Sequence, residues 1–242
     1  MDDVSWRAEW DAQAERWIAL TQSDPMYDHI NKPAFLDLLP PPVGITLEVG
    51  CGEGRIAREL EAVGHTVIGV DGSHALTRAA RGNTLPIPVG VGDIHSLPFR
   101  DDAADLVVCF MVLMDIDDLD TAVAELARVL KPTGRLCVGV LHPIATSGLF
   151  LPGDEQRTFY MGEYLKPMRH VLDIERFDGS TFRFRVEHRP IEHYSRSIEA
   201  AGLVIEAIRE PRPTAEDAAR DPALANWARV PDFLHLRAAK VR

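Results

Sequence analysis

The sequence predicts an α/β fold, in which a mostly parallel β-sheet carries helices on both faces. From Ile45 onward, short apolar runs alternate with amphipathic segments of helical spacing, which is typical of parallel sheets covered on both sides. A glycine-rich turn joins the first apolar run to the first of these helices. The chain has 242 residues, 46% hydrophobic and 26% charged. It is therefore long enough to bury a sizeable core without disulfides or metals.

Composition and charge exclude several classes of protein. The chain as a whole is neither disordered, collagen-like nor coiled-coil. Its formal net charge of −11 at pH 7 argues against nucleic acid as the main partner, because phosphate binding needs clustered Lys and Arg. Three cysteines without a Cys-x-x-Cys pair favour neither a disulfide framework nor a zinc ribbon. The start lacks a signal-peptide pattern, and the longest apolar run, residues 106–114, is too short to span a bilayer. We therefore expect a cytoplasmic protein without a membrane partner.

An N-terminal helical cap is expected over residues 1–42. Trp6, Trp10 and Trp17 recur at helical spacing within residues 5–20, and we interpret them as a packing stripe. Pro33 is placed to open a second helix, which Pro40-Pro41-Pro42 ends.

The sheet domain is predicted in two parts, 43–142 and 191–242. Gly64 and Gly202 stand where helices end, as C-cap glycines do, and Lys131-Pro132 stops another helix. Strands are expected at 45–49, 66–70, 88–91, 105–111, 135–141, 203–209 and 233–240, with helices at 55–63, 75–81, 119–130 and 191–201.

Residues 143–190 interrupt this alternation. Two strand-like runs, 170–177 and 181–188, flank Asp178-Gly179, which is a strong hairpin signal. Long segments of this kind in a compact domain are usually lids or binding loops. We therefore expect a lid insert.

The turn after the first strand is the most informative stretch. Its glycines stand at 50, 52 and 54, and Arg55 follows. Glycine is needed where the backbone takes positive φ or approaches a ligand closely. The third glycine of the G-x-G-x-x-G nicotinamide fingerprint is missing, and so is the Gly-Lys-Ser/Thr of a Walker A loop.

Two acids follow at matching places. Asp71 ends the second strand, 21 positions after Gly50, a distance at which an acid reaches the ribose hydroxyls of a nucleoside. Asp93 follows the third strand and could accept from an adenine amino group while the Ile94 backbone meets a ring nitrogen. A turn or helix-cap role for Asp93 is the alternative. Together these elements point to an adenosine-type ligand.

These elements, with residues 105–108 and 126–136, resemble class I S-adenosylmethionine-dependent methyltransferases. The nearest branch is the small-molecule group similar to ubiquinone and menaquinone (type 11) methyltransferases. The resemblance covers residues 45–141, and Thr133 departs from it where the family usually has glycine. It implies a Rossmann-like, seven-stranded, mostly parallel sheet whose last strand, 233–240, is antiparallel beside 203–209. It also implies S-adenosyl-L-methionine as cofactor and S-adenosyl-L-homocysteine as product.

Residue by residue, the resemblance assigns the cofactor site. Glu48 would face the methionine end, the glycines would admit the backbone, and the end of the fourth strand would line the sulfonium. Trp17 lies in the N-terminal segment that usually closes over the methionine moiety. The implied cofactor-binding residues are Glu48, Gly50, Gly52, Asp71, Gly72, Asp93, Ile94, Phe110, Met111 and Tyr27.

The acceptor side is less defined by sequence. His142, directly after the fifth strand, could be a general base or a histidine bonded to nearby backbone. Asp115 lies after the fourth strand, where some methyltransferases place a metal-binding acid. Asp117, Asp118 and Asp120 precede or open a helix and are interpreted as caps, and no metal is expected. Residues 143–190, with the N-terminal helices, are expected to roof the acceptor pocket. Candidate acceptor-binding residues are Tyr160, Tyr164, His188 and Arg189.

Methyl transfer to a small organic acceptor is the expected function, on oxygen, nitrogen or carbon. A macromolecular (RNA or protein) methyltransferase is one alternative. A fold relative that binds the cofactor without transferring methyl is another. A nicotinamide oxidoreductase is disfavoured by the glycine spacing. The protein is expected to be a monomer or a homodimer.

Overall fold

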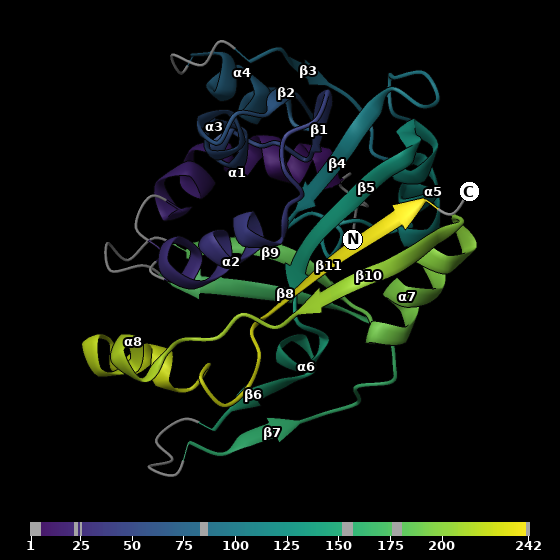
Figure 1. Cartoon of the computed structure of the whole chain (residues 1–242). Coiled ribbons are helices and arrows are strands. Elements are labelled where there is room, and N and C mark those ends of the chain that lie inside the picture. The colour runs from purple at the N-terminus through teal and green to yellow at the C-terminus, as the bar shows by residue number, and fades with distance from the viewer. Residues whose placement is uncertain are drawn as a thin grey trace.

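The computed structural model describes residues 6–21, 24, 26–82, 87–151, 157–175 and 181–240. Their centre is a seven-stranded sheet with strand order β10-β11-β5-β4-β1-β2-β3 (Figure 1). Only β11 runs antiparallel to its neighbours, β5 and β10. The expected sheet, with its antiparallel last strand, is confirmed. Its strands are β1 (Ile45–Val49), β2 (Thr66–Asp71), β3 (Val89–Val91), β4 (Ala104–Phe110), β5 (Leu130–Leu141), β10 (Leu203–Arg209) and β11 (Phe233–Lys240).

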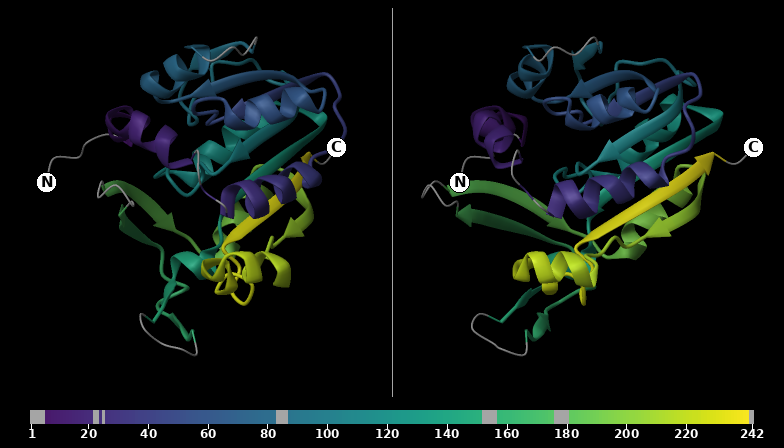
Figure 2. Two further views of the ribbon diagram at one scale, coloured as in Figure 1. Left: turned by 90° about the vertical axis from the view of Figure 1, so that its left-hand side faces the viewer. Right: turned by 60° about the vertical axis from the view of Figure 1, so that its left-hand side comes forward.

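Helices cover both faces of the sheet, as expected. Side chains alternate across a strand, and on β4 Val107 and Cys109 join one apolar cluster while Leu106 and Val108 join another. The first cluster includes α5 (Leu119–Val129) and α7 (Ile191–Ala200), and the second includes α2 (Lys32–Leu38) and α3 (Arg55–Ala62). A buried central strand therefore supplies two separate cores (Figure 2).

The N-terminal cap differs from the prediction only in detail. Helix α1 spans Trp6–Thr21, and a π-helical turn at Met26–Asn31 leads into α2, with Pro33 in its first turn. Helix α4 (His74–Gly82) lies beside α1.

Strand β5 begins five residues earlier than predicted, because Leu130 pairs with Ala104 ahead of a register shift. Among the described helices, none has the length and apolar character needed to cross a membrane.

The insert divides into two small ribbons outside the main sheet. Strands β6 (Gly148–Phe150) and β7 (Phe159–Met161) pair with each other, as do β8 (Met168–Glu175) and β9 (Thr181–His188). The β8–β9 ladder agrees with the predicted hairpin, although Asp178-Gly179 lies outside the described residues. Helix α6 (Pro143–Thr146) precedes the first ribbon.

The two ribbons lie against different parts of the molecule (Figures 1 and 2). Arg185 of β9 pairs with Glu9 of α1 at 2.8 Å. In the other ribbon, Phe150 stacks edge-on against Trp227, which follows the short helix η2 (Pro222–Ala225) near α8 (Ala215–Arg220). The segment expected to form one lid therefore forms two separate ribbons, which contact different parts of the chain.

Candidate functional site

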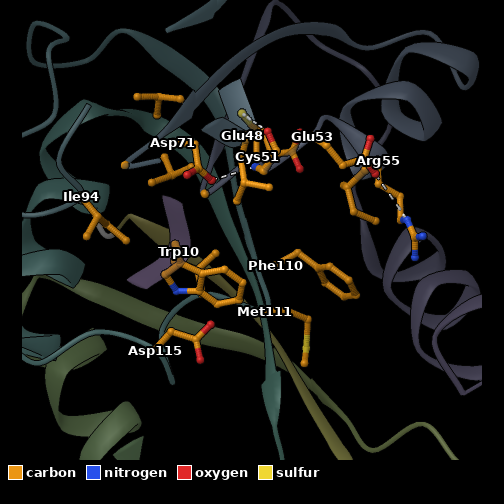
Figure 3. A pocket seen from close by; sticks show the side chains of 18 of the residues that line it. Trp10, Glu48, Cys51, Glu53, Arg55, Asp71, Ile94, Phe110, Met111 and Asp115 are labelled. Carbon is orange, nitrogen blue, oxygen red and sulfur yellow. Dashed lines mark hydrogen bonds and ion pairs between the residues drawn. The ribbon is translucent and has the colours of Figure 1, made fainter. Parts of the chain in front are cut away.

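A pocket opens at the carboxyl ends of β1, β2 and β4, where open α/β sheets bind ligands (Figure 3). Its walls come from α1, the glycine turn, the end of β2 and the loop after β4. Lining residues that the sequence assigned to the cofactor are Tyr27, Glu48, Gly50, Gly52, Asp71, Gly72, Ile94, Phe110 and Met111. The fold therefore brings together all but one of the predicted cofactor residues.

The glycine turn has the backbone geometry that its sequence indicated. Gly50, Gly52 and Gly54 have φ of 76°, 55° and 83°, values that side-chain-bearing residues rarely adopt. A Cβ on Gly50 would stand 2.2 Å from the Val112 side chain, so close packing also requires glycine there. A Cβ on Gly52 would meet nothing within 4 Å. The space beside Gly52 is therefore open to a ligand.

Asp71 is fixed beside this turn. One carboxylate oxygen accepts from the Gly52 N–H at 2.7 Å and the other from the Ser73 N–H at 2.8 Å. Burial raises the pKa of Asp71, and these two hydrogen bonds oppose the rise. The backbone thus orients the carboxylate at the pocket wall, where it can accept hydrogen bonds from the hydroxyl groups of a ligand.

Glu48 faces the same pocket, and one of its carboxyl oxygens has no partner among the described residues. This oxygen is Oε2, and the side chain is 3% exposed. Burial, followed by the nearby Asp71 and Glu53 carboxylates, raises the pKa of Glu48 well above its ordinary value. An uncompensated buried carboxyl of this kind is suited to a ligand that carries a positive charge.

Arg55 supplies the opposite charge, and sequence reasoning missed it. Its guanidinium lies 4.5 Å from the centre of the Tyr27 ring and donates to the Thr21 carbonyl. Buried NH1 has no hydrogen-bond partner among the described residues. The signal in the sequence was that Arg55 stands at the position of the third glycine of the G-x-G-x-x-G fingerprint. A pocket holding an unmatched carboxyl and an unmatched guanidinium N–H fits a zwitterionic amino-acid group.

The tryptophan stripe lies on the pocket rather than only in packing. Trp6, Trp10 and Trp17 all line it, which corrects the interpretation of the stripe. Asp11 fixes α1 there by accepting from the Ser73 hydroxyl at 2.6 Å and the Ala75 N–H at 2.9 Å. One amphipathic face cannot show from sequence whether it meets a core or a cavity, because both are apolar.

Asp93 is the predicted cofactor residue that does not line the pocket. Its Oδ1 accepts from the His95 N–H at 3.0 Å, and its carboxylate pairs with Arg7. This is the turn geometry that was its alternative role. Ile94 does line the pocket.

Phe110 and Met111 stand where β4 leaves the sheet. Met111 takes the left-handed conformation, with φ of 58°, and its N–H donates to the Gly139 carbonyl at 2.7 Å. Strained backbone outside glycine tends to occur at binding sites. Asp115 follows in the same loop and also lines the pocket, although sequence reasoning did not assign it to the site. The α5 cap is Asp118, which accepts from the Thr121 N–H.

His142 does not line the pocket. It is fully buried at the start of α6, where Nδ1 accepts from the Ile144 N–H at 3.0 Å and Nε2 lies 3.0 Å from Glu210. Burial lowers its pKa, and Glu210 opposes the shift. With both ring nitrogens engaged, this geometry does not support the general-base role.

The four acceptor candidates also lie outside the pocket lining. Tyr160 is 63% exposed on β7, and the Tyr164 hydroxyl accepts from the Ile191 N–H. His188 joins Thr146 to the Tyr164 carbonyl. Arg189 is 5% exposed and donates to backbone carbonyls of the loop after β4. Tyr164 and Arg189 join the insert to the sheet domain, and His188 is bonded within the insert, so the polar atoms of these three residues contact protein.

Comparison with known proteins gives concordant matches. Residues 47–138 match the model of the methyltransferase domain family. A ubiquinone biosynthesis O-methyltransferase from Alkalilimnicola ehrlichii is 32% identical over 154 residues, which make up 59% of this chain and 62% of that protein. A demethylmenaquinone methyltransferase from Streptomyces avermitilis is 34% identical over 92 residues, 38% of this chain and 40% of that one. The chain thus matches less than two thirds of either relative's length.

The fold comparison extends over most of the chain. An S-adenosylmethionine-dependent methyltransferase structure from Mesorhizobium loti superposes with a TM-score of 0.72 at 24% identity. The superposition covers 85% of this chain and 95% of that one. At this identity the similarity concerns the fold.

Proposed function

We propose that the protein is an S-adenosylmethionine-dependent methyltransferase that methylates a small organic acceptor. Residues 47–138 match a methyltransferase-domain family, and the fold superposes on that of an S-adenosylmethionine-dependent methyltransferase. The cofactor supplies the electrophilic methyl group. The chain itself supplies binding, alignment and exclusion of water.

One observation carries this proposal: three polar groups in a single pocket match the cofactor's chemistry. The Glu48 carboxyl would take the ammonium of the methionine moiety, and Arg55 NH1 its carboxylate. Asp71 would accept from the ribose hydroxyls. Asp71 is held by the Gly52 N–H and Arg55 by the Thr21 carbonyl and the Tyr27 ring, so these two groups need little ordering on binding.

The acceptor is proposed to be small for two reasons. The two curated relatives above are named for quinone biosynthesis, and the net charge of −11 disfavours nucleic acid. Tryptophans of α1 also wall the pocket, which suits an apolar molecule. A macromolecular acceptor would instead show as methyl transfer to RNA or protein when both are offered beside small phenols and amines. Cofactor binding without transfer to any of them would favour the non-transferring alternative.

Titration calorimetry with S-adenosyl-L-homocysteine tests the cofactor assignment. Asp71→Asn should weaken binding about 10- to 100-fold, because a charged acceptor of hydroxyl hydrogen bonds is lost. The matched control is Asp101→Asn, whose side chain is 75% exposed and outside the pocket. It should leave affinity unchanged. Absence of binding to the wild-type protein, or tighter binding of NAD, would contradict the proposal.

A further inference from the structure

Asp115 is a half-buried acid that the proposed cofactor contacts leave unused. It lies in the loop between β4 and α5 and lines the pocket. Its Oδ1 is inaccessible to solvent and has no hydrogen-bond partner within the described part of the chain. Figure 3 shows Asp115 and Glu48 at opposite ends of the pocket, with Trp10 between them.

The backbone around Asp115 is committed to another element. Arg189 donates to the Leu113 and Asp117 carbonyls, each at 2.9 Å. The Glu187 N–H donates to the Met114 carbonyl at 2.7 Å. The end of β9 therefore holds the loop on both sides of Asp115, and the carboxyl is fixed in place while its own Oδ1 stays unmatched. Leaving such an atom unmatched costs free energy, which a ligand's donor would recover.

The cofactor's charged groups are already matched at the other end of the pocket. Glu48, Arg55 and Asp71 take the methionine and ribose moieties under the proposed function. The end with Asp115 is left for the acceptor, in a wall that also contains Trp10, Met111 and Ile116. A single carboxyl in an apolar wall selects molecules that present a hydrogen-bond donor and disfavours anions.

We propose that Asp115 contacts the acceptor's nucleophilic atom and takes its proton, so that the acceptor is a small, largely apolar hydroxyl or amine compound. This inference rests on the proposed function. During transfer the acceptor oxygen or nitrogen uses a lone pair to form the bond to the methyl carbon. The sulfur–methyl bond would break with its electron pair going to sulfur, and the acceptor's proton would pass to Asp115 Oδ1, which would release it after the product leaves the pocket. Burial raises the pKa of Asp115 well above its ordinary value, against the Arg189 charge, which makes the carboxylate a stronger base.

Sinefungin tests this placement without knowledge of the acceptor. In this analogue an amine-bearing carbon replaces the methylated sulfur, so its ammonium stands where the methyl group would be transferred. Asp115→Asn should weaken sinefungin at least about tenfold and S-adenosyl-L-homocysteine less than about twofold. Asp115→Ser provides a second neutral side chain should the first variant fold poorly.

The matched control is Asp117→Asn, in the same loop with a side chain that is 60% exposed. It should change neither affinity. Parallel losses for both ligands, or no loss of sinefungin affinity in Asp115→Asn, would overturn the inference. Failure of S-adenosyl-L-homocysteine to bind the wild-type protein would instead overturn the proposed function.

Ring compounds of one size test the acceptor class. Benzyl alcohol, benzylamine and benzoate can be compared by saturation-transfer NMR on protein saturated with S-adenosyl-L-homocysteine. Benzyl alcohol or benzylamine should bind better than benzoate. In Asp115→Asn the affinities of these compounds and of benzoate should become more similar. Stronger binding of benzoate, or no binding of any of the three, would count against this class.

Discussion

Glu48, Arg55 and Asp115 each leave a buried polar atom without a partner among the described residues. Native proteins pair nearly all such atoms, and three around one cavity are therefore informative. Two carboxyls and one guanidinium at separate positions match ligands with several charges or donors. At the residue scale, the site is marked by unmatched buried polar atoms.

His235 is a buried histidine that does not line the pocket. Its burial predicts that stability depends on pH. It is fully buried, its Nε2 lies 2.7 Å from Asn31 Oδ1, and desolvation lowers its pKa from 6.5 to about 4. Between these values the unfolded chain binds the proton and the folded chain does not. Stability should therefore fall as pH drops from about 6.5 to 4, by up to about 3 kcal/mol.

Urea denaturation between pH 4 and 8 checks this prediction, with His235→Gln as the non-titrating comparison. The variant should lose less stability than the wild type as pH falls. Asp232, whose pKa burial raises to about 7, acts in the opposite direction, since its neutral form is favoured in the fold. Its contribution is common to both proteins, so it cancels in the difference. Equal pH slopes for the two proteins would contradict the assignment.

At the element scale, the loop between β4 and α5 depends on a side chain far along the chain. The Arg189 guanidinium is buried and spans loop carbonyls from Leu113 to Asp117. Because this buried guanidinium donates to several carbonyls of the loop, it joins the end of β9 to the sheet domain. The same loop carries Asp115, so Arg189 is a positioning residue for it.

Arg189→Met should destabilise the fold by about 2–4 kcal/mol, because buried carbonyls lose their donor. Hydrogen exchange in the loop 111–118 should become faster. The control, Arg196→Met, removes an exposed arginine paired with Glu192 and should change stability by less than about 0.5 kcal/mol. Urea unfolding and exchange mass spectrometry measure both effects. Similar stabilities for the two variants would rule out the proposed role of Arg189 in holding the loop between β4 and α5.

At the scale of the whole molecule, the pocket lies between the sheet and α1. The helix is fixed by Asp11 to α4 and by Glu9 to β9, so two separate parts of the chain hold α1 in place over the site. The β6–β7 ribbon lies elsewhere, against Trp227. Ligand binding should therefore affect these regions unequally.

Hydrogen exchange with and without S-adenosyl-L-homocysteine tests this arrangement. At a ligand concentration 100 times the dissociation constant, the bound state gains about 2.7 kcal/mol. Amides of α1 that exchange by opening from the pocket should slow about a hundredfold. Exchange across β6 and β7 should not change. Protection of that ribbon without protection of α1 would contradict this placement of the site.

Local sequence patterns were enough to predict the sheet, most strand limits and most of the lining of the proposed cofactor pocket. These features are local: apolar runs of fixed period specify strands, and positive φ at Gly50 and Gly52 requires glycine. An acid at the end of β2 is carried to the glycine turn by the parallel pairing alone. Such information is contained within short stretches of chain, so it could be predicted.

Only the tertiary structure decided which polar groups remain unmatched. His142, His188 and Arg189 look like site residues in sequence, yet distant backbone and side-chain groups satisfy them. Arg55 and Asp115 were not assigned to the site from sequence, yet each keeps an unpartnered buried atom at the pocket. Whether a side chain is satisfied depends on neighbours remote in sequence, and composition or spacing carries no record of them.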